Sequence, residues 1–385
     1  MRKSALFWFG LVVTVLVTLG LVILSSASEA NAMRLHNDAY FFIRRQFMYL
    51  GVGVVLAVVV SLFDYHKWRD WQFLTWTFFA VVMVLLVAVF QFRAINGSHR
   101  WIALGPVRVQ PSELAKMLTV ILLGVWLDKS GWRVEKFVRG ALWPSVLIGV
   151  IALPVLKEPD FGSVMVIGAV GFLMMFVSGT RLLHMLPFLL GGVGVVVFKV
   201  MTNANRMARI AAFFGVKINL GAEVVDEAAK RAAYQVEQAL AAIGNSDIWG
   251  AGLGESMQKH LYLPEAHTDF VFAVGAEELG VVFSVATVLL FVAFFALSVY
   301  IARKASDRFG RFLVIGMAFI IFFQAMFNIG VVCKALPTKG MALPFFSYGG
   351  TNLLSAFFAV GTILSVGIHS YRDKKRALLR KVVMR

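Results

Sequence analysis

Ten apolar stretches, each of 17 residues or more, set the limits of what this chain of 385 residues can fold into. A helix needs about 20 apolar residues to cross the hydrocarbon core of a bilayer. Apolar residues make up 59% of the chain and charged residues 15%, against about 25% charged in soluble domains. The excess apolar surface must therefore face lipid. We predict an all-α polytopic membrane protein whose bundle of about ten transmembrane helices forms a single domain over residues 1–385. The stretches are roughly 6–27, 46–64, 72–92, 112–128, 140–156, 161–177, 184–201, 271–300, 313–333 and 348–370.

The net charge of +16 is unevenly distributed along the chain. If the N-terminus is cytoplasmic, the inner segments hold 20 basic residues in 56 positions and the outer segments hold 15 in 124. This asymmetry follows the positive-inside rule and places both termini in the cytoplasm. The basic tail 371–385 then anchors the topology at anionic lipid. The charge needs no nucleic acid partner.

Composition and pattern exclude a disulfide or zinc scaffold and a nucleotide-binding protein. The single cysteine, Cys333, cannot form an internal disulfide and has no ligand cluster of zinc spacing beside it. The glycine-rich segment 249–254 follows no strand and precedes no P-loop lysine, so it does not indicate a nucleotide-binding site. We predict no organic cofactor. Arg2 and Lys3 with the apolar run that follows imitate a secretory signal, but that run exceeds the usual 7–15 residues. We expect a retained first helix.

The long polar loops all fall on the outer side, at 93–111, 202–270 and 334–347. We therefore expect function on that face. Within the large extracytoplasmic loop 202–270, apolar residues recur at helical spacing between 222 and 243, opposite Asp226, Lys230, Arg231 and Gln238. This pattern predicts an amphipathic helix that ends at Gly244. It either lies at the membrane interface or packs across the mouth of the bundle.

Ionisable residues within or beside apolar spans are costly and are the default functional candidates. Glu113 and Lys116 have the i, i+3 spacing of a pair on one helix face, although Lys116 could instead reach toward the interface. Glu158 and Asp160 flank a proline between two spans, where acidic residues also serve as ordinary helix starts.

A second group of candidates lies at the outer ends of the last three spans or, for Glu277 and Glu278, inside the eighth span. Glu265, His267, Thr268 and Asp269 precede the eighth span, and Thr268 or Asp269 could simply cap that helix. At least one of Glu277 and Glu278 should face the bundle interior, in a proton relay or in a buried pair with a lysine. Lys339, Ser347, Tyr348 and Gly349 offer a cation, hydroxyls and backbone donors that suit an anionic headgroup, or else form only a turn and a helix start.

Short motifs recur in order across nearly the whole chain, at 100–102, 110–116, 158–162, 234–235, 252–254, 263–270, 336–340 and 347–350. In order and spacing, these segments resemble the SEDS family of cell-wall polymerases. The forms of 263–270 and 336–340 are closer to the division members than to the elongation members. The segment 245–249 departs from the Ser-Gly-Gly usual at that place in the family.

The resemblance implies a peptidoglycan glycosyltransferase that polymerises lipid II into glycan strands in the outer leaflet of the bacterial inner membrane, at the division septum. Its implied partners are lipid II, the nascent glycan strand, a class B penicillin-binding protein that crosslinks the strands, and other divisome membrane proteins. Inverting β-1,4 transfer needs a general base, and Asp269 matches the residue implied for that role. A carboxylate in a poorly solvated cavity has a raised pKa, which suits a base near neutral pH.

Positive charge must stabilise the departing pyrophosphate, and Arg108 and Lys116 match basic residues implied for the cavity. A divalent cation, Mg²⁺ or Mn²⁺, is also expected, with Asp269 as one of its ligands beside Glu265 or Asp160 if the fold brings these loops together. Two rival functions use the same features. A lipid II flippase would move the substrate without forming a bond, and a non-catalytic scaffold would only recruit a crosslinking enzyme; an elongation-type polymerase is the alternative within the family.

Overall fold

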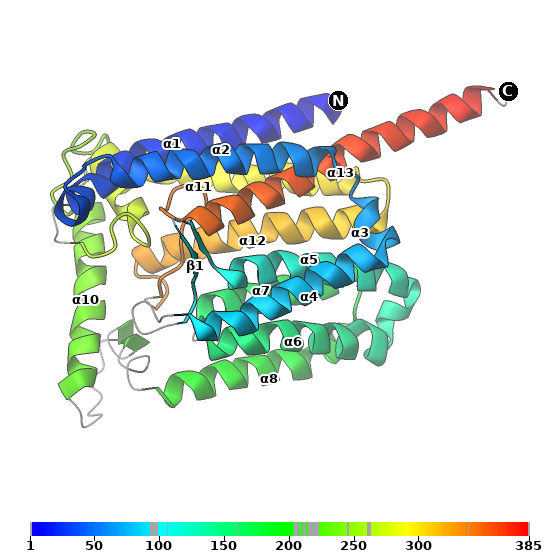
Figure 1. Ribbon diagram of the computed structural model, residues 1–385, viewed down its shortest axis with the longest axis horizontal. Coiled ribbons are helices and arrows are strands. Elements are labelled where there is room, and N and C mark those ends of the chain that lie inside the picture. The colour runs from blue at the N-terminus through cyan, green and yellow to red at the C-terminus, as the bar shows by residue number, and fades with distance from the viewer. Residues whose placement is uncertain are drawn as a thin grey trace.

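In the part of the chain that the computed structural model describes, ten long helices run side by side, and both chain termini lie at the same end of this bundle (Figure 1). We call the end that holds the termini the terminal end and the opposite end the loop end. The structure describes residues 2–92, 99–105, 107–158, 160–203, 207, 209–210, 213–214, 223–244, 246–259, 263–337 and 339–383. The ten helices are α1 (Arg2–His36), α2 (Phe41–Leu62), α4 (Gln72–Ala88), α5 (Pro111–Ser130), α6 (Trp143–Lys157), α7 (Phe161–Ser178), α8 (Leu182–Met201), α11 (Val271–Arg303), α12 (Arg308–Val332) and α13 (Gly350–Val383).

Each of the ten predicted spans falls on one of these helices, so the predicted fold class is confirmed. Nine helices in the described part of the chain are long and apolar enough to cross a membrane. The tenth, α5, carries Glu113, Lys116, Asp128 and Lys129. Most of its other side chains are buried, because it lies inside the bundle against α7 and α12. A multi-pass membrane protein results, in which the charged helix α5 is shielded from lipid.

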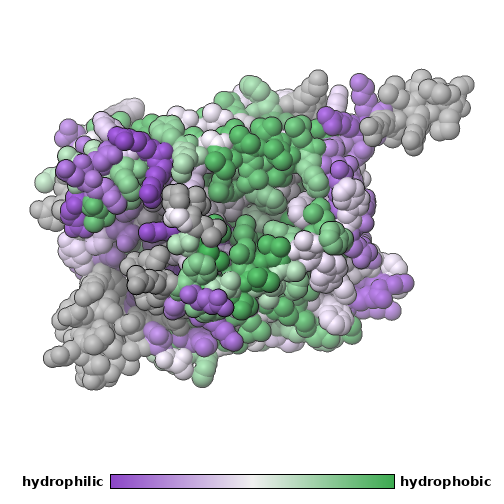
Figure 2. Space-filling view, in the orientation of Figure 1, coloured by the Kyte–Doolittle hydropathy of each residue, from purple (hydrophilic) through white to green (hydrophobic). Residues whose placement is uncertain are grey.

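The surface of the bundle matches a bilayer environment. In Figure 2 a band of apolar side chains covers the middle of the visible face, and hydrophilic side chains gather at both ends. Helix α8 lies at the periphery and buries only Met185, whereas α12 and α13 are largely enclosed by other helices. The outer helices therefore present apolar faces to lipid, and the inner helices carry the packed core.

A two-stranded antiparallel sheet at the loop end was not predicted from the sequence. Strands β1 (Ile102–Leu104) and β2 (Val107–Val109) pair so that Ile102 faces Val109 and Leu104 faces Val107. Gly105 adopts a left-handed φ of 63° where the turn between them begins. Part of the loop expected at 93–111 therefore forms a β-hairpin. The strands are too short for their alternation to stand out from a loop.

The expected amphipathic helix is present as α10 (Glu223–Gly244), which crosses the loop end of the bundle (Figure 1). It packs against α11 and α12 and buries Val236, Ala239 and Ala242. Of the two placements open from the sequence, these contacts favour the one in which the helix packs across the mouth of the bundle.

Helix α11 is broken at Gly280, where the loop 246–259 reaches into it. Gly280 has φ 74° and ψ −164°, and an added Cβ there would lie 2.4 Å from the Ile248 carbonyl oxygen. The loop N–H groups of Ala251 and Gly252 donate to the carbonyls of Glu277 and Glu278, at 2.9 and 3.0 Å. The loop thus replaces the hydrogen bonds that the helix loses at the break.

The buried partner expected for one of the two adjacent glutamates is Lys259. Its Nζ lies 3.3 Å from Glu278 Oε1, and both side chains are almost fully buried. Ser26 Oγ on α1 donates to the same carboxylate oxygen at 2.5 Å. Glu277 accepts from the Ser256 hydroxyl and from the Met257 N–H group. Both glutamates therefore hold the loop 246–259 against α11.

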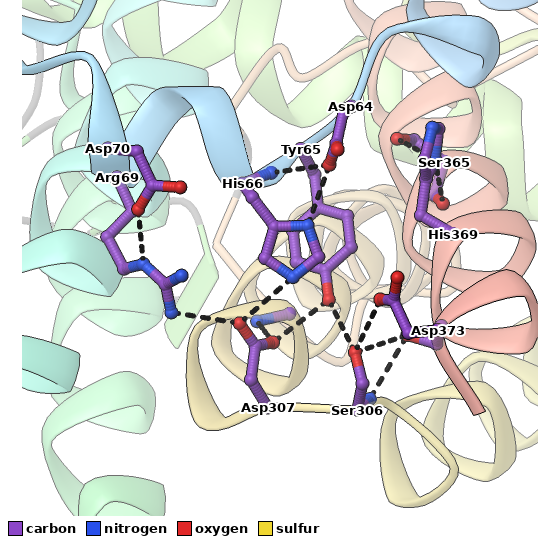
Figure 3. A network of polar contacts seen from close by, with 12 residues as sticks. Asp64, Tyr65, His66, Arg69, Asp70, Ser306, Asp307, Ser365, His369 and Asp373 are labelled. Carbon is purple, nitrogen blue, oxygen red and sulfur yellow. Dashed lines mark hydrogen bonds and ion pairs between the residues drawn. The ribbon is translucent and has the colours of Figure 1, made fainter. Parts of the chain in front are cut away.

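A polar network closes the terminal end of the bundle (Figure 3). Asp307 caps α12 by accepting from the Gly310 N–H group at 2.9 Å. It also accepts from the Tyr65 hydroxyl at 3.0 Å and from Arg69 Nη1 at 3.1 Å. The hydrogen bond to Asp307 and the neighbouring Asp64 raise the pKa of His66, on the short helix α3 (His66–Asp70), to about 9. A cationic His66 and an anionic Asp307 thus fasten the α2–α3 connection to α12.

Candidate active site

Asp269 lies in a tight turn just before α11, at the loop end. Glu265 adopts a left-handed φ of 58°, and its carbonyl accepts from the N–H groups of Thr268, Asp269 and Phe270 at 3.1, 3.1 and 3.3 Å. The Thr268 hydroxyl donates to Glu265 Oε2 at 2.9 Å. Phe270 is the N-cap residue of α11, and neither Thr268 nor Asp269 supplies a capping side chain among the described contacts. The simple capping role left open from the sequence is therefore wrong.

Two segments from elsewhere in the chain enclose the Asp269 turn. Gly340 lies so close that an added Cβ would fall 2.1 Å from Asp269 Oδ2. Asn328 on α12 donates through Nδ2 to the carbonyl oxygens of Asp269 and Met341, at 2.7 and 2.6 Å. The segment 339–341, which follows α12, is thereby held against the turn that carries the carboxylate.

Burial raises the pKa of Asp269 to about 6, and the Glu265 carboxylate adds to this effect. The positive charges of Arg209, Arg100 and Lys339 act in the opposite direction. A carboxyl group with a pKa near 6 is ionised at neutral pH and accepts a proton more readily than an ordinary aspartate. Its position and its pKa suit a general base.

The Asp160 carboxyl group differs from that of Asp269 in its hydrogen bonds and in the direction of its pKa shift. It caps α7 by accepting from Ser163, at 2.7 Å from the hydroxyl. Its Oδ2 also accepts from Ser112 Oγ at 3.0 Å and from Gln110 Nε2 at 3.1 Å. Burial alone would raise its pKa, but Lys339, Arg100 and the Ser163 hydrogen bond outweigh that effect and lower it. Asp160 is therefore held as a permanent anion that organises the site.

The charge of Lys339 acts on both of these carboxylates. Its charge lowers the pKa of both Asp160 and Asp269, and its Nζ lies 5.0 Å from the centre of the Phe161 ring. Gly162 gives it room, because an added Cβ there would lie 3.2 Å from Lys339 Cε. The ring holds the ammonium group by a cation–π contact on the face of α7.

Glu158 and Arg100 border the same region. Arg100 Nε donates to the carbonyl oxygen of Glu158 at 3.3 Å. The Glu158 side chain is buried, and burial together with Asp160 raises its pKa to about 8, against the opposing charge of Arg100. Glu158 is therefore largely protonated at neutral pH, which removes one negative charge from this site.

Lys116 and Glu113 form the predicted i, i+3 pair. Lys116 Nζ donates to Glu113 Oε1 at 2.7 Å, and Ser355 on α13 donates to the other carboxylate oxygen at 2.9 Å. Lys116 is only 1% exposed, so it does not reach toward the interface as the alternative required. Arg108 lies on β2 with an exposed side chain, and its carbonyl accepts from Thr351 on α13 at 2.8 Å. The ammonium group of Lys116 is thus enclosed by the bundle, whereas the guanidinium group of Arg108 lies at its surface.

The segment 347–349 joins the Asp269 turn to α2 through hydrogen bonds. Ser347 Oγ donates to the Thr268 carbonyl and accepts from the Leu343 N–H group, and the Tyr348 N–H group donates to the His267 carbonyl at 2.9 Å. Gln46 on α2 completes the support. Its Oε1 accepts from the Gly349 N–H group at 3.5 Å, and its Nε2 donates to the Ser347 carbonyl.

His267 is stacked on Phe42 with ring centroids 4.8 Å apart, and burial lowers its pKa despite Glu265. Its neutral ring packs between α2 and the turn.

Four of the candidates come together at the loop end of α7 and α11: Glu158, Asp160, Asp269 and Lys339. Six more candidates form the turn that carries the Asp269 carboxylate or lie beside it: Glu265, His267, Thr268, Ser347, Tyr348 and Gly349. Sequence reasoning missed Asn328, Arg209 and Gln46. A buried asparagine in an apolar span was a visible signal for Asn328. Arg209, one exposed cation in a polar loop, had none.

The donor atoms of the described residues do not by themselves make up the expected metal site. The described residues contain no group of three or more His, Cys, Asp or Glu side chains that could hold a metal ion. The carboxylate of Asp160 is already engaged by three side chains. These protein groups alone do not form a preformed cation site, so no catalytic step is assigned to a protein-bound metal.

Comparisons with known proteins agree with this geometry. Residues 6–372 match the family model FTSW_RODA_SPOVE, described as a cell cycle protein. A "Probable peptidoglycan glycosyltransferase FtsW" from Trichlorobacter lovleyi is 35% identical over 357 residues, which cover 92% of this chain and 91% of that protein. A protein of the same name from Escherichia coli is 35% identical over 387 residues, which cover 99% of this chain and 89% of that protein.

Solved structures of related proteins also match the fold of this chain. A chain of the structure described as "Structural coordination of polymerization and crosslinking by a peptidoglycan synthase complex" has a TM-score of 0.74 at 25% identity, covering 95% of this chain and 98% of that one. The rod shape determining protein RodA of Thermus thermophilus has a TM-score of 0.69 at 26% identity, with 95% and 97% coverage. The resemblance seen in the sequence motifs is confirmed, and this chain belongs to the FtsW/RodA/SpoVE family.

Proposed function

We propose that this chain is a peptidoglycan glycosyltransferase of the FtsW type that polymerises lipid II. The names of its relatives support the reaction class. The observation that carries the proposal is the Asp269 carboxylate, which is held against Gly340, has a raised pKa and is surrounded by the cations Arg100, Arg209 and Lys339. A base beside clustered positive charge is what transfer from a pyrophosphate-linked donor requires.

In the proposed reaction, Asp269 accepts the proton of the attacking sugar hydroxyl. That oxygen bonds to the anomeric carbon of the second lipid-linked sugar from the side opposite the leaving group. The bond between this carbon and the pyrophosphate oxygen breaks, and the electron pair leaves with the pyrophosphate. The anomeric centre is inverted and a β-1,4 linkage results. The proton on Asp269 is then released to water.

The negative charge that develops on the leaving pyrophosphate needs positive charge close to the base. Lys339, Arg100 and Arg209 act on the Asp269 carboxylate and lie at the loop end. Lys116 is committed to Glu113, so we assign it to the electrostatic support of Asp160 rather than to direct contact with the leaving group. A divalent cation, Mg²⁺ or Mn²⁺, would bind together with the pyrophosphate, since phosphate oxygens would supply the ligands that the described side chains lack.

The same proposal includes a membrane location, a partner and a role. Both termini are cytoplasmic, which places the Asp269 turn at the outer face of the bacterial inner membrane. The solved complex that this fold matches couples polymerization to crosslinking, and the partner we propose here is a class B penicillin-binding protein. The higher identity to FtsW relatives than to RodA supports division at the septum rather than elongation.

The test is a polymerisation assay with the full-length protein in nanodiscs, its class B partner, lipid II and Mg²⁺. Asp269→Asn removes the base and keeps the side-chain shape. Glu255→Gln, in the exposed part of loop 246–259, is the matched control for loss of a carboxylate. We expect Asp269→Asn to lower the turnover number by about 10²–10⁴ and the control to stay within about twofold of wild type.

Equal polymer from wild type and Asp269→Asn would exclude Asp269 as the base. A flippase would transfer labelled lipid II between leaflets without lengthening it, and a scaffold would support wall synthesis in cells with the Asp269→Asn variant. Depletion in cells separates the two polymerase roles, because loss of a division enzyme gives long filaments and loss of an elongation enzyme gives round cells.

A further inference from the structure

One buried amide connects the two segments that carry the chemical groups of the site. Asn328 lies on α12 and is 2% exposed. Its Nδ2 donates one hydrogen bond to the Asp269 carbonyl at 2.7 Å and the other to the Met341 carbonyl at 2.6 Å. The first acceptor belongs to the residue we propose as base. The second lies two residues after Lys339, which we propose as a cation for the leaving group.

Only the amide nitrogen can serve both contacts. Both acceptors are carbonyl oxygens, so the alternative orientation of the amide would set oxygen against oxygen. The Asn328 Oδ1 atom is buried, and no described group donates a hydrogen bond to it. A buried acceptor without a partner lowers stability. Because the unpaired oxygen is unfavourable for α12, the role of this amide lies in the two hydrogen bonds that its nitrogen donates.

The geometry points to Asn328 as a positioning residue that sets the distance between the Asp269 turn and the segment 339–341. This inference rests on the proposed function, because it assigns Asn328 a role that acts through the base. One nitrogen atom limits how far the two carbonyls can separate. Among the described contacts, Asn328 alone bonds to both Asp269 and Met341, next to the contact between the Asp269 carboxylate and Gly340. It acts together with the hydrogen bonds from Ser347 and Tyr348, which hold the same turn from further along the loop.

Loss of the amide should therefore change two properties of Asp269 together. If the segments separate, the carboxylate moves away from its productive place, and a misplacement of about 1 Å can cost 10²-fold in rate. Water also enters beside the carboxylate, and the pKa then falls toward its ordinary value of about 3.9. The charged groups that act on the carboxylate are Glu265 on its own turn, Lys339 on the facing segment, and Arg100 and Arg209 from the neighbouring loops.

The experiment compares Asn328→Ala and Asn328→Asp with wild type in the lipid II polymerisation assay. Asn328→Asp keeps the shape but replaces the donor with an acceptor, so it should be at least as impaired as Asn328→Ala. We expect kcat to fall by about 10- to 100-fold in both variants while KM changes by less than about threefold. The acidic limb of the kcat–pH profile should move to lower pH by about one unit in Asn328→Ala.

The control is Gln324→Ala. Gln324 lies one helical turn away on the same face of α12, is 6% exposed, and makes no described hydrogen bond to either segment. It should match wild type within about twofold. A variant that only loses folded protein lowers the amplitude of the whole pH profile without moving its acidic limb, so this readout separates positioning from stability.

Asp269→Asn in the same assay keeps the two proposals distinguishable. An inactive Asp269→Asn variant beside Asn328 variants with wild-type kcat and wild-type pH profile would overturn the positioning role alone. A fully active Asp269→Asn variant would overturn both proposals. Failure to obtain either Asn328 variant as folded protein would assign Asn328 to folding and would overturn the positioning role as well.

Discussion

Replacing the proposed base should make the protein more stable while it stops polymerisation. Burial raises the pKa of Asp269 from 3.8 to about 6, so the folded state disfavours the ionised carboxylate. At about 1.4 kcal/mol per pH unit, this amounts to roughly 3 kcal/mol at neutral pH if the unfolded chain has the ordinary pKa. Neighbouring water and relaxation reduce the figure. We expect Asp269→Asn to raise the free energy of unfolding by roughly 1–3 kcal/mol at pH 7.5.

The direction of the pKa shift determines at which pH the gain in stability of Asp269→Asn is present. An acid whose pKa is raised in the folded state holds its proton there while the unfolded chain has lost it. The destabilisation by Asp269 is therefore complete above about pH 6 and disappears as the pH falls toward 4. The advantage of Asp269→Asn over wild type should shrink over the same interval.

Asp160→Asn provides the opposite case. The pKa of Asp160 is lowered in the folded state, so its ionised form stabilises the fold at neutral pH and that stability is lost as the pH falls through the folded pKa. Removing its charge weakens the hydrogen bonds from Ser112, Ser163 and Gln110 and should cost about 1–3 kcal/mol at pH 7.5.

The assay is reversible denaturation of the full-length protein in mixed micelles, followed at pH 7.5, 6 and 5 for wild type and the two variants. An Asp269→Asn variant that is no more stable than wild type at pH 7.5 would refute the argument that the carboxylate is desolvated. So would a gain that is the same at all three values of pH.

Three further predictions follow from the contacts described above. The turnover number should fall about tenfold between pH 7.5 and pH 5, with a midpoint near 6, because Asp269 must be ionised to accept a proton; a flat profile would contradict this. Lys259→Met should cost about 3–5 kcal/mol in the denaturation assay by leaving Glu278 buried without its cation, and the double variant with Glu278→Gln should recover much of that loss. Gly340→Ala should lower kcat by about 10-fold or more with unchanged lipid II binding, since its Cβ would displace the Asp269 carboxylate; wild-type kcat would show that the close contact is not needed.

The positions of the ten spans could be predicted because each depends on a local property. A continuous apolar run of the right length has one stable environment, the bilayer, and its ends are marked by charged loops. The Glu113–Lys116 pair was predictable for the same reason, because residues three apart on a helix are neighbours whatever surrounds them. The amphipathic helix α10 was likewise visible from its periodicity.

Other features depended on chain segments that are distant in sequence. The break of α11 at Gly280 is stabilised by backbone groups of loop 246–259, which no periodicity could reveal. The hairpin β1–β2 is held to α13 through Thr351, 241 residues or more away. The pairing of Lys259 with Glu278 was one of two possibilities for the glutamates, and only the fold selected it.

The sequence by itself determined that this protein is a membrane bundle with its long polar loops on one side, and its motifs pointed to Asp269. Only the tertiary structure decided how two similar aspartates divide their roles. Asp160 is surrounded by hydrogen-bond donors and stays ionised, whereas Asp269 is pressed against Gly340 and accepts a proton more readily. The physical reason is that the pKa of a carboxyl group is set by the charges, donors and water around it, and a fold brings these together from several helices.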